Sequence, residues 1–186
     1  MEGKSQLSFL ERGEPVAVDI WISEPAKKQF GAWLKHSMRG LEFGSGCSTL
    51  WLSQRVKSLV SVEHHVGWYE RVKGILDCNG VTNVELIYAE PENYTDVLGD
   101  YADGWFDFVF NDGLAKLRNK CIEDSWSKIR KGGVMVIDNS EASHSRRGIR
   151  LITERGAKGV RYHGAVTNPW TGRHNAKGIE TSIWTK

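Results

Sequence analysis

The sequence predicts an α/β fold in which a doubly wound, mostly parallel sheet of seven strands is covered by helices on both faces. From Arg39 onward, short apolar runs alternate with amphipathic stretches of helical period, and each apolar run ends in a polar residue or a glycine. The first run leads into a glycine-rich turn and a further apolar stretch, which indicates a strand, a tight turn and a helix. This alternation is typical of a parallel sheet, because helices return the chain between parallel strands.

The expected elements follow from this pattern in chain order. Strands are predicted at residues 40–43, 58–63, 83–88, 106–111, 133–138, 159–166 and 178–185. A leading helix begins at Ser23-Glu24-Pro25, with Ser23 as the cap and Pro25 in the first turn. Two later helices are expected over residues 69–76, closed by Asn79-Gly80, and over residues 117–129, closed by Gly132-Gly133.

The chain is expected to form one domain over residues 23–186, preceded by an arm over residues 1–22. Gly13 and Pro15 interrupt any periodic pattern in the arm. A chain of 186 residues is long enough to bury a core without disulfides or metals.

Composition excludes several classes of partner. The net charge is +2, from 25 basic and 23 acidic residues, so no nucleic-acid partner is expected. No stretch approaches the length of about 20 apolar residues that spans a bilayer, so no membrane partner is expected either. The three cysteines lie far apart without a Cys-x-x-Cys pair, which indicates reduced thiols and a cytoplasmic protein.

The segment from Leu41 to Leu52 predicts a nucleoside site. Gly44 and Gly46 let the backbone turn sharply and approach a ligand, and the helix that follows points its free N–H groups toward that ligand. Glu63 ends the next predicted strand, where a carboxylate can accept hydrogen bonds from both hydroxyls of a ribose.

The pattern around these glycines differs from that of a dinucleotide site. The third glycine of a dinucleotide fingerprint is replaced by Thr49, and Glu42 stands two residues before the first glycine. Glu-x-Gly-x-Gly with a distal acid resembles the first two motifs of class I S-adenosylmethionine-dependent methyltransferases. The resemblance implies a Rossmann-like sheet with an antiparallel C-terminal edge hairpin, which residues 159–166 and 178–185 would form.

The same resemblance implies S-adenosylmethionine as the cofactor. Strand-end residues and the glycine turn are the expected contacts, namely Glu42, Phe43, Gly44, Ser45, Gly46, Ser48, Glu63, His64, Glu90 and Asp112. Asp112 is expected near the methionine portion of the cofactor.

Residues later in the chain are similar to those of small stand-alone methyltransferases. The similarity covers most of residues 23–140 and includes Asp112-Gly113, Arg118, Gly132-Gly133 and Asp138-Asn139. It makes Arg118 and Asn139 candidates for binding the acceptor. Trp170, in a late polar loop, is a third candidate as a residue that covers the acceptor.

Asp112, Asp138 and Asn139 raise the alternative of a metal site. Catechol-type and caffeoyl-CoA-type O-methyltransferases hold a divalent cation with residues at similar positions, and oxygen ligands suit magnesium or calcium. Those enzymes continue with an acid, a lysine and a tyrosine, whereas this chain has residues 113–116 as Gly-Leu-Ala-Lys. We therefore expect no metal and an Asp138-Asn139 pair that caps the following turn, with the divalent cation as the alternative.

Two residues are candidates for catalysis, and His163 and His174 are alternatives to the second of them as the general base. Asp138 ends the fifth predicted strand, and His144 follows it on the expected acceptor side, where it could serve as a general base toward a hydroxyl.

The predicted function is methyl transfer from S-adenosylmethionine to an oxygen or nitrogen of a small acceptor. Aminopropyl transfer and a non-catalytic, methyltransferase-like binding module are the alternatives. The short chain leaves little room for a specificity domain, so either the N-terminal arm or the partner subunit of a homo-oligomer is expected to complete the acceptor pocket.

Overall fold

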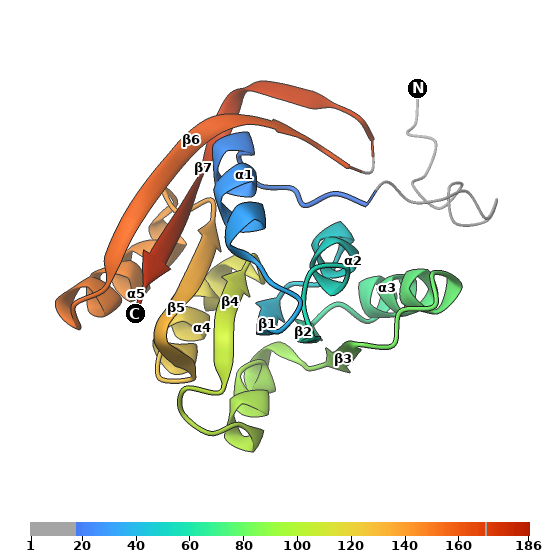
Figure 1. Cartoon of the computed structure of the whole chain (residues 1–186), viewed down its shortest axis with the longest axis horizontal. Helices are drawn as coiled ribbons and strands as arrows, with labels where there is room; N and C mark the ends of the chain where they lie inside the picture. The colour runs from blue at the N-terminus through green and yellow to red at the C-terminus, as the bar shows by residue number, and fades with distance from the viewer. Residues whose placement is uncertain (1–17, 170) are drawn as a thin grey trace.

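The computed structural model describes residues 18–169 and 171–186, and it shows one sheet covered on both faces by helices (Figure 1). The helices are α1 (Glu24–Trp33), α2 (Cys47–Ser53), α3 (Val66–Cys78), α4 (Arg118–Ser125) and α5 (Ser143–Glu154). The strands are β1 (Arg39–Phe43), β2 (Ser58–Glu63), β3 (Val84–Tyr88), β4 (Phe106–Asn111), β5 (Ile129–Asp138), β6 (Lys158–Thr167) and β7 (His174–Thr185). Short 3₁₀ turns occupy Pro91–Asn93, Asp96–Asp100 and Ala115–Leu117.

The sheet has seven strands in the order β3-β2-β1-β4-β5-β7-β6. The first five strands of this order run parallel, and β7 runs antiparallel to both β5 and β6. These findings confirm the predicted sheet and its antiparallel edge. The strand order reverses between β1 and β4, and in such sheets ligands bind at the carboxyl ends of the strands beside this switch point.

Each face of the sheet has its own apolar core. On β4, Val109 belongs to the cluster beneath α4 and α5, while Phe108 and Phe110 belong to the cluster beneath α1 and α2. A strand that is buried on both faces needs apolar residues at successive positions, which explains the continuous run in β4.

The helix predicted over residues 117–129 is too long. The structure ends α4 at Ser125 and begins β5 at Ile129, so Gly132-Gly133 lies within a strand instead of closing a helix. Gly132 has a φ of 72°, and a Cβ on Gly133 would lie 2.4 Å from the carbonyl oxygen of Asp107. The pairing of β4 and β5 shifts register here, so the two glycines form an irregularity in the strand.

Residues 18–22 pack against the domain, although most of the predicted arm lies outside the described residues. Ile20 and Ile22 are buried beside α1. Ser23 precedes α1 as predicted, but its hydroxyl does not cap the helix: it donates to the carbonyl oxygen of Tyr162 at 2.9 Å. Figure 1 shows the β6–β7 hairpin curving past α1, so this contact attaches the start of the domain to its last hairpin.

None of the helices in the described ranges is long and apolar enough to cross a membrane.

Candidate functional site

The glycine turn after β1 requires glycine at position 44. Gly44 has a φ of 90°, and a Cβ there would lie 2.7 Å from the carbonyl oxygen of Asp112. Its N–H donates to the carbonyl oxygen of Val62 at 2.9 Å. The turn is therefore packed between the ends of β2 and β4, where the sequence places its strand-end acids.

Glu42 lies behind this turn and is fully buried. Its carboxylate accepts hydrogen bonds from the hydroxyls of three residues on α2 and β2, namely Ser48 at 2.5 Å, Thr49 at 2.6 Å and Ser61 at 2.5 Å. Burial raises the pKa of Glu42 to about 7, although these hydrogen bonds act in the opposite direction. Glu42 thus ties β1 to α2 and β2.

Glu63 ends β2 with its carboxylate held by backbone amides. One oxygen accepts from the amides of His64 at 2.9 Å and His65 at 2.8 Å, and the other accepts from the amide of Ser45 at 3.1 Å. Only 3% of the residue is exposed, yet it lines a cavity. Since each carboxylate oxygen can accept more than one hydrogen bond, capacity for a ligand remains.

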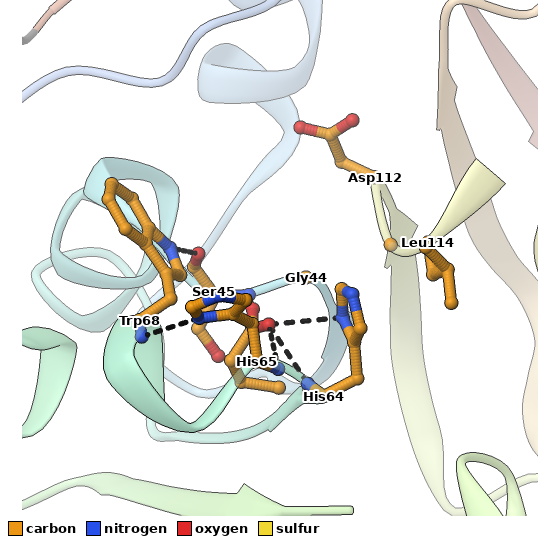
Figure 2. Close-up of a pocket in the computed structure, with 9 residues that line it drawn as sticks. Gly44, Ser45, His64, His65, Trp68, Asp112 and Leu114 are labelled. Atoms are coloured by element: carbon orange, nitrogen blue, oxygen red, sulfur yellow. Dashed lines mark hydrogen bonds and ion pairs between the residues drawn. The ribbon is translucent and has the colours of Figure 1, made fainter. Parts of the chain in front are cut away.

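The cavity at this switch point has a volume of about 390 Å³. Its lining consists of the glycine turn and the ends of β2, α3 and β4: Gly44, Ser45, Glu63, His64, His65, Trp68, Asp112, Gly113 and Leu114. Figure 2 shows Trp68 on one side of the cavity and Asp112 on the other. The indole N–H of Trp68 donates to the carbonyl oxygen of Ser45 at 2.5 Å, which fixes the ring beside the turn.

A second cavity of about 250 Å³ adjoins the first and shares Ser45, Trp68 and Asp112 with it. The other lining residues come from four segments. They are Trp21 before α1, Gly46, Cys47 and Ser48 at the start of α2, Phe110 on β4, and Asn168 and Pro169 between β6 and β7. The thiol of Cys47 is in its neutral form here, because burial raises its pKa to about 12.

Arg118 contacts oxygen atoms of all three residues that were considered as metal ligands, Asp112, Asp138 and Asn139. Its guanidinium donates to a carboxylate oxygen of Asp112 at 2.5 Å, to the backbone oxygen of Asp138 at 2.5 Å and to that of Gly113 at 3.0 Å. The side-chain oxygen of Asn139 lies 3.5 Å from the same guanidinium. The positive φ of Asn139, 49°, is a conformation that asparagine tolerates well.

These contacts do not fit a divalent cation. The guanidinium of Arg118 already supplies positive charge to the oxygens of Asp112, Asp138 and Asn139. Asp138 instead accepts a hydrogen bond from the hydroxyl of Thr181 at 2.7 Å.

The pKa values of the two acids beside Arg118, Asp112 and Asp138, are both raised. Burial raises the pKa of Asp112, and the neighbouring Arg118 opposes the rise. Burial, and then the charge of Asp112, raise the pKa of Asp138 well above its usual range. One guanidinium thus lies beside two acids, the partly exposed Asp112 and the buried Asp138.

The structure brings most of the predicted cofactor contacts together. Gly44, Ser45, Glu63, His64 and Asp112 line the first cavity, while Gly46 and Ser48 line the second. Three predicted contacts line neither: Glu42 lies behind the turn, Phe43 is in the core, and Glu90 is exposed beyond β3.

None of the described residues that were predicted for catalysis or acceptor binding lines either cavity. His144 lies in the first turn of α5 and lines neither cavity, and burial followed by the charge of Arg118 lowers its pKa. Asp138, Asn139 and Arg118 form the cluster beside Asp112 without lining either cavity. Trp170 falls outside the described residues.

Sequence reasoning missed Trp21 as a wall of the site. Ile20 and Ile22 are buried while Trp21 between them is 45% exposed, so these residues alternate like a strand. The sequence itself does not single out Trp21, because Ile20, Trp21 and Ile22 are all apolar.

Comparisons with known proteins find solved structures of the same fold. The cofactor-bound protein Rv0187 from MTB is 21% identical, with a TM-score of 0.67, over 97% of this chain and 87% of that chain. An O-methyltransferase from Bacillus cereus in complex with S-adenosylhomocysteine is 17% identical, with a TM-score of 0.67, over 97% and 89% of the two chains. The O-methyltransferase TomG from Streptomyces achromogenes, involved in tomaymycin synthesis and in complex with S-adenosylmethionine, is 18% identical, with a TM-score of 0.67, over 99% and 90%.

These similarities in structure establish a shared fold, and no curated protein matches the chain in sequence. The family itself is identified by a sequence model described as a methyltransferase domain, which matches residues 41–140 and thus more than half of the chain. The chain therefore belongs to the methyltransferase-domain family, as its resemblance to class I S-adenosylmethionine-dependent methyltransferases predicts.

Proposed function

We propose that the protein transfers the methyl group of S-adenosylmethionine to a hydroxyl oxygen of a small acceptor, with nitrogen as the alternative acceptor atom. The observation that carries this proposal is the pair of adjoining cavities with Ser45, Trp68 and Asp112 as common walls. Two bound molecules that exchange a group directly need such neighbouring sites. Oxygen is favoured because two of the similar structures are described as O-methyltransferases.

The first cavity suits the cofactor. Its volume of about 390 Å³ lies within the range of small-molecule sites, roughly 300–1,000 Å³. The carboxylate of Glu63 would accept from the ribose hydroxyls, and its amide contacts fix its orientation before the ligand arrives. Asp112 on the opposite side would face the positively charged part of the cofactor. Bound S-adenosylmethionine supplies an electrophilic methyl group.

Glu42 acts in this proposal as a positioning residue. Its three hydroxyl contacts join the strand before the glycine turn to the helix after it, and they leave its carboxylate without access to either cavity. Removing the carboxylate would loosen the turn rather than delete a ligand contact.

The second cavity is assigned to the acceptor, and the reaction is proposed to need no metal ion. The guanidinium of Arg118 supplies the positive charge beside Asp112 that a divalent cation would otherwise supply. Asp138 and His144 line neither cavity, so in this proposal they stabilise the structure around the site and do not contact the acceptor. The main contribution of the protein is then to hold two reactants in line. The methyl group would leave the sulfonium sulfur for the hydroxyl oxygen, S-adenosylhomocysteine would be the leaving group, and the hydroxyl proton would pass to water.

The two alternatives are less well supported. An aminopropyl transferase needs acidic residues for a polyamine, whereas Asp112 is the one carboxylate among the described residues that line the second cavity. A non-catalytic module would not need a separate acceptor cavity beside the cofactor cavity.

The proposal is tested by incubating the protein with methyl-labelled S-adenosylmethionine and a panel of small hydroxyl and amino compounds, with and without EDTA. We expect label to transfer to a hydroxyl compound at a rate that EDTA leaves unchanged, and transfer to disappear in Glu63→Ala. Transfer to amines alone would replace oxygen with nitrogen. Activity that EDTA abolishes and magnesium restores would contradict the metal-independent part of the proposal.

A further inference from the structure

Trp21 is a large aromatic side chain held at the surface by a fixed backbone. Its neighbours Ile20 and Ile22 are 2% and 1% exposed, whereas Trp21 is 45% exposed. Lys27 pairs with Asp19 at 2.9 Å, and the amide of Ser23 donates to the Thr181 hydroxyl at 3.1 Å. The exposed indole is therefore presented by a segment that is anchored on both sides, and core packing does not account for it.

Trp21 connects the second cavity to a third one. The third cavity has a volume of about 490 Å³ and is lined by Trp21 together with Asn168, Thr171, Arg173, His174 and Asn175. Trp21 and Asn168 line both cavities. A ligand long enough to leave the second cavity past Trp21 would therefore enter the third.

The inner part of this path is aromatic. Trp68 and Phe110 line the second cavity together with Trp21, and Phe110 is almost fully buried. The ring of Trp68 is fixed by its hydrogen bond to the carbonyl oxygen of Ser45. Flat, rigid aromatic walls favour a flat apolar group, and the volume of about 250 Å³ suits a single ring with its substituents.

The outer part of the path carries the positive charge of Arg173. Arg173 and His174 line the third cavity, and no acidic residue does so among the residues that the structure describes. Over the same described ranges, no carboxylate forms an ion pair with the guanidinium of Arg173. An arginine that no acid neutralises at the mouth of a cavity favours a carboxylate or phosphate group.

We propose that the acceptor is an aromatic compound that carries an anionic group: its ring lies between Trp21, Trp68 and Phe110, and its anion lies at Arg173. This inference rests on the proposed function and adds the chemical class of the acceptor. Trp21 determines selectivity for the ring, and Arg173 determines selectivity for the charge.

The test is calorimetric titration of the protein saturated with S-adenosylhomocysteine. The probes are 4-hydroxybenzoate, its uncharged analogue 4-hydroxybenzamide, and cyclohexanecarboxylate, which keeps the anion without the aromatic ring. We expect 4-hydroxybenzoate to bind most tightly. Arg173→Gln should weaken its binding about tenfold while leaving 4-hydroxybenzamide unchanged, and Trp21→Leu should weaken both.

Arg150→Gln is the matched control, because Arg150 is an exposed arginine on α5 that lines neither of these cavities. It should bind 4-hydroxybenzoate as the wild type does. If S-adenosylhomocysteine binds but 4-hydroxybenzoate does not, or if Arg173→Gln has no effect, this inference is overturned and the proposed function stands. If S-adenosylhomocysteine itself fails to bind, the proposed function is overturned as well.

Discussion

Arg118 donates a hydrogen bond from its guanidinium to a carboxylate oxygen of Asp112 over 2.5 Å, and the arginine side chain is 8% exposed. The same guanidinium binds the backbone oxygens of Gly113 and Asp138. One side chain of α4 thereby connects the carboxyl ends of β4 and β5 next to the first cavity.

Replacement of Arg118 by methionine should destabilise the protein. It would leave the partly exposed carboxylate of Asp112 and the backbone oxygens of Gly113 and Asp138 without their donor, and the loss of hydrogen bonds from a charged group costs about 1.5–3 kcal/mol. Urea unfolding measures the difference. The exposed pair of Arg150 and Glu154, 3.8 Å apart, provides the control: Arg150→Met should change the free energy of unfolding by less than about 1 kcal/mol. Equal stability of Arg118→Met and the wild type would refute the structural role of this guanidinium.

Glu42 should make the stability of the wild type fall as pH rises. Its pKa is about 7 in the folded protein against a usual value of 4.5. Between these values the folded state binds more protons than the unfolded state, so the free energy of unfolding decreases through this window and levels off above pH 7. The penalty above pH 7 is about 3 kcal/mol for a shift of this size.

Glu42→Gln should remove the contribution of Glu42 to that slope, since the amide does not titrate. Thermal or urea unfolding between pH 5 and pH 8 should therefore show the wild type losing about 2–3 kcal/mol relative to the variant. Glu90→Gln, at an exposed position, should follow the wild-type profile. Parallel profiles for the wild type and Glu42→Gln would show that Glu42 titrates normally.

A Gly44→Ala substitution should disrupt both folding and cofactor binding. Alanine is strained at a φ of 90°, and its Cβ would collide with the backbone of Asp112 and Gly113. Gly74→Ala is the control, because Gly74 lies within α3 with nothing within 4 Å of a Cβ. This control should stabilise the protein by about 0.5–1 kcal/mol in thermal or urea unfolding. The strain argument fails if Gly44→Ala is as stable as the wild type.

The sheet and the cofactor side of the site were predictable because local patterns determine them. The strand-end positions of Glu63 and Asp112 and the glycines at 44 and 46 all lie within or beside short periodic segments. The boundary at Ile129 was missed because Gly132-Gly133 is compatible both with the end of a helix and with a bulge, and the partner strand decides between them.

The acceptor side was less predictable, because tertiary packing assembles it. Trp21 and Asn168 are distant in sequence and meet only where the β6–β7 hairpin passes the chain before α1. The role of Arg118 likewise depends on three backbone and side-chain partners from two strand ends, which no local pattern specifies.

The central claim is that the cavity at the ends of β1, β2 and β4 binds S-adenosylmethionine through Glu63. The most direct measurement is calorimetric titration with S-adenosylhomocysteine of the wild type, Glu63→Ala and Glu90→Ala, with thermal unfolding of each variant to confirm that it is folded. The account predicts binding by the wild type and by Glu90→Ala within about twofold of each other, and at least about tenfold weaker binding by folded Glu63→Ala. Wild-type affinity in Glu63→Ala, or no binding by the folded wild type, would contradict it.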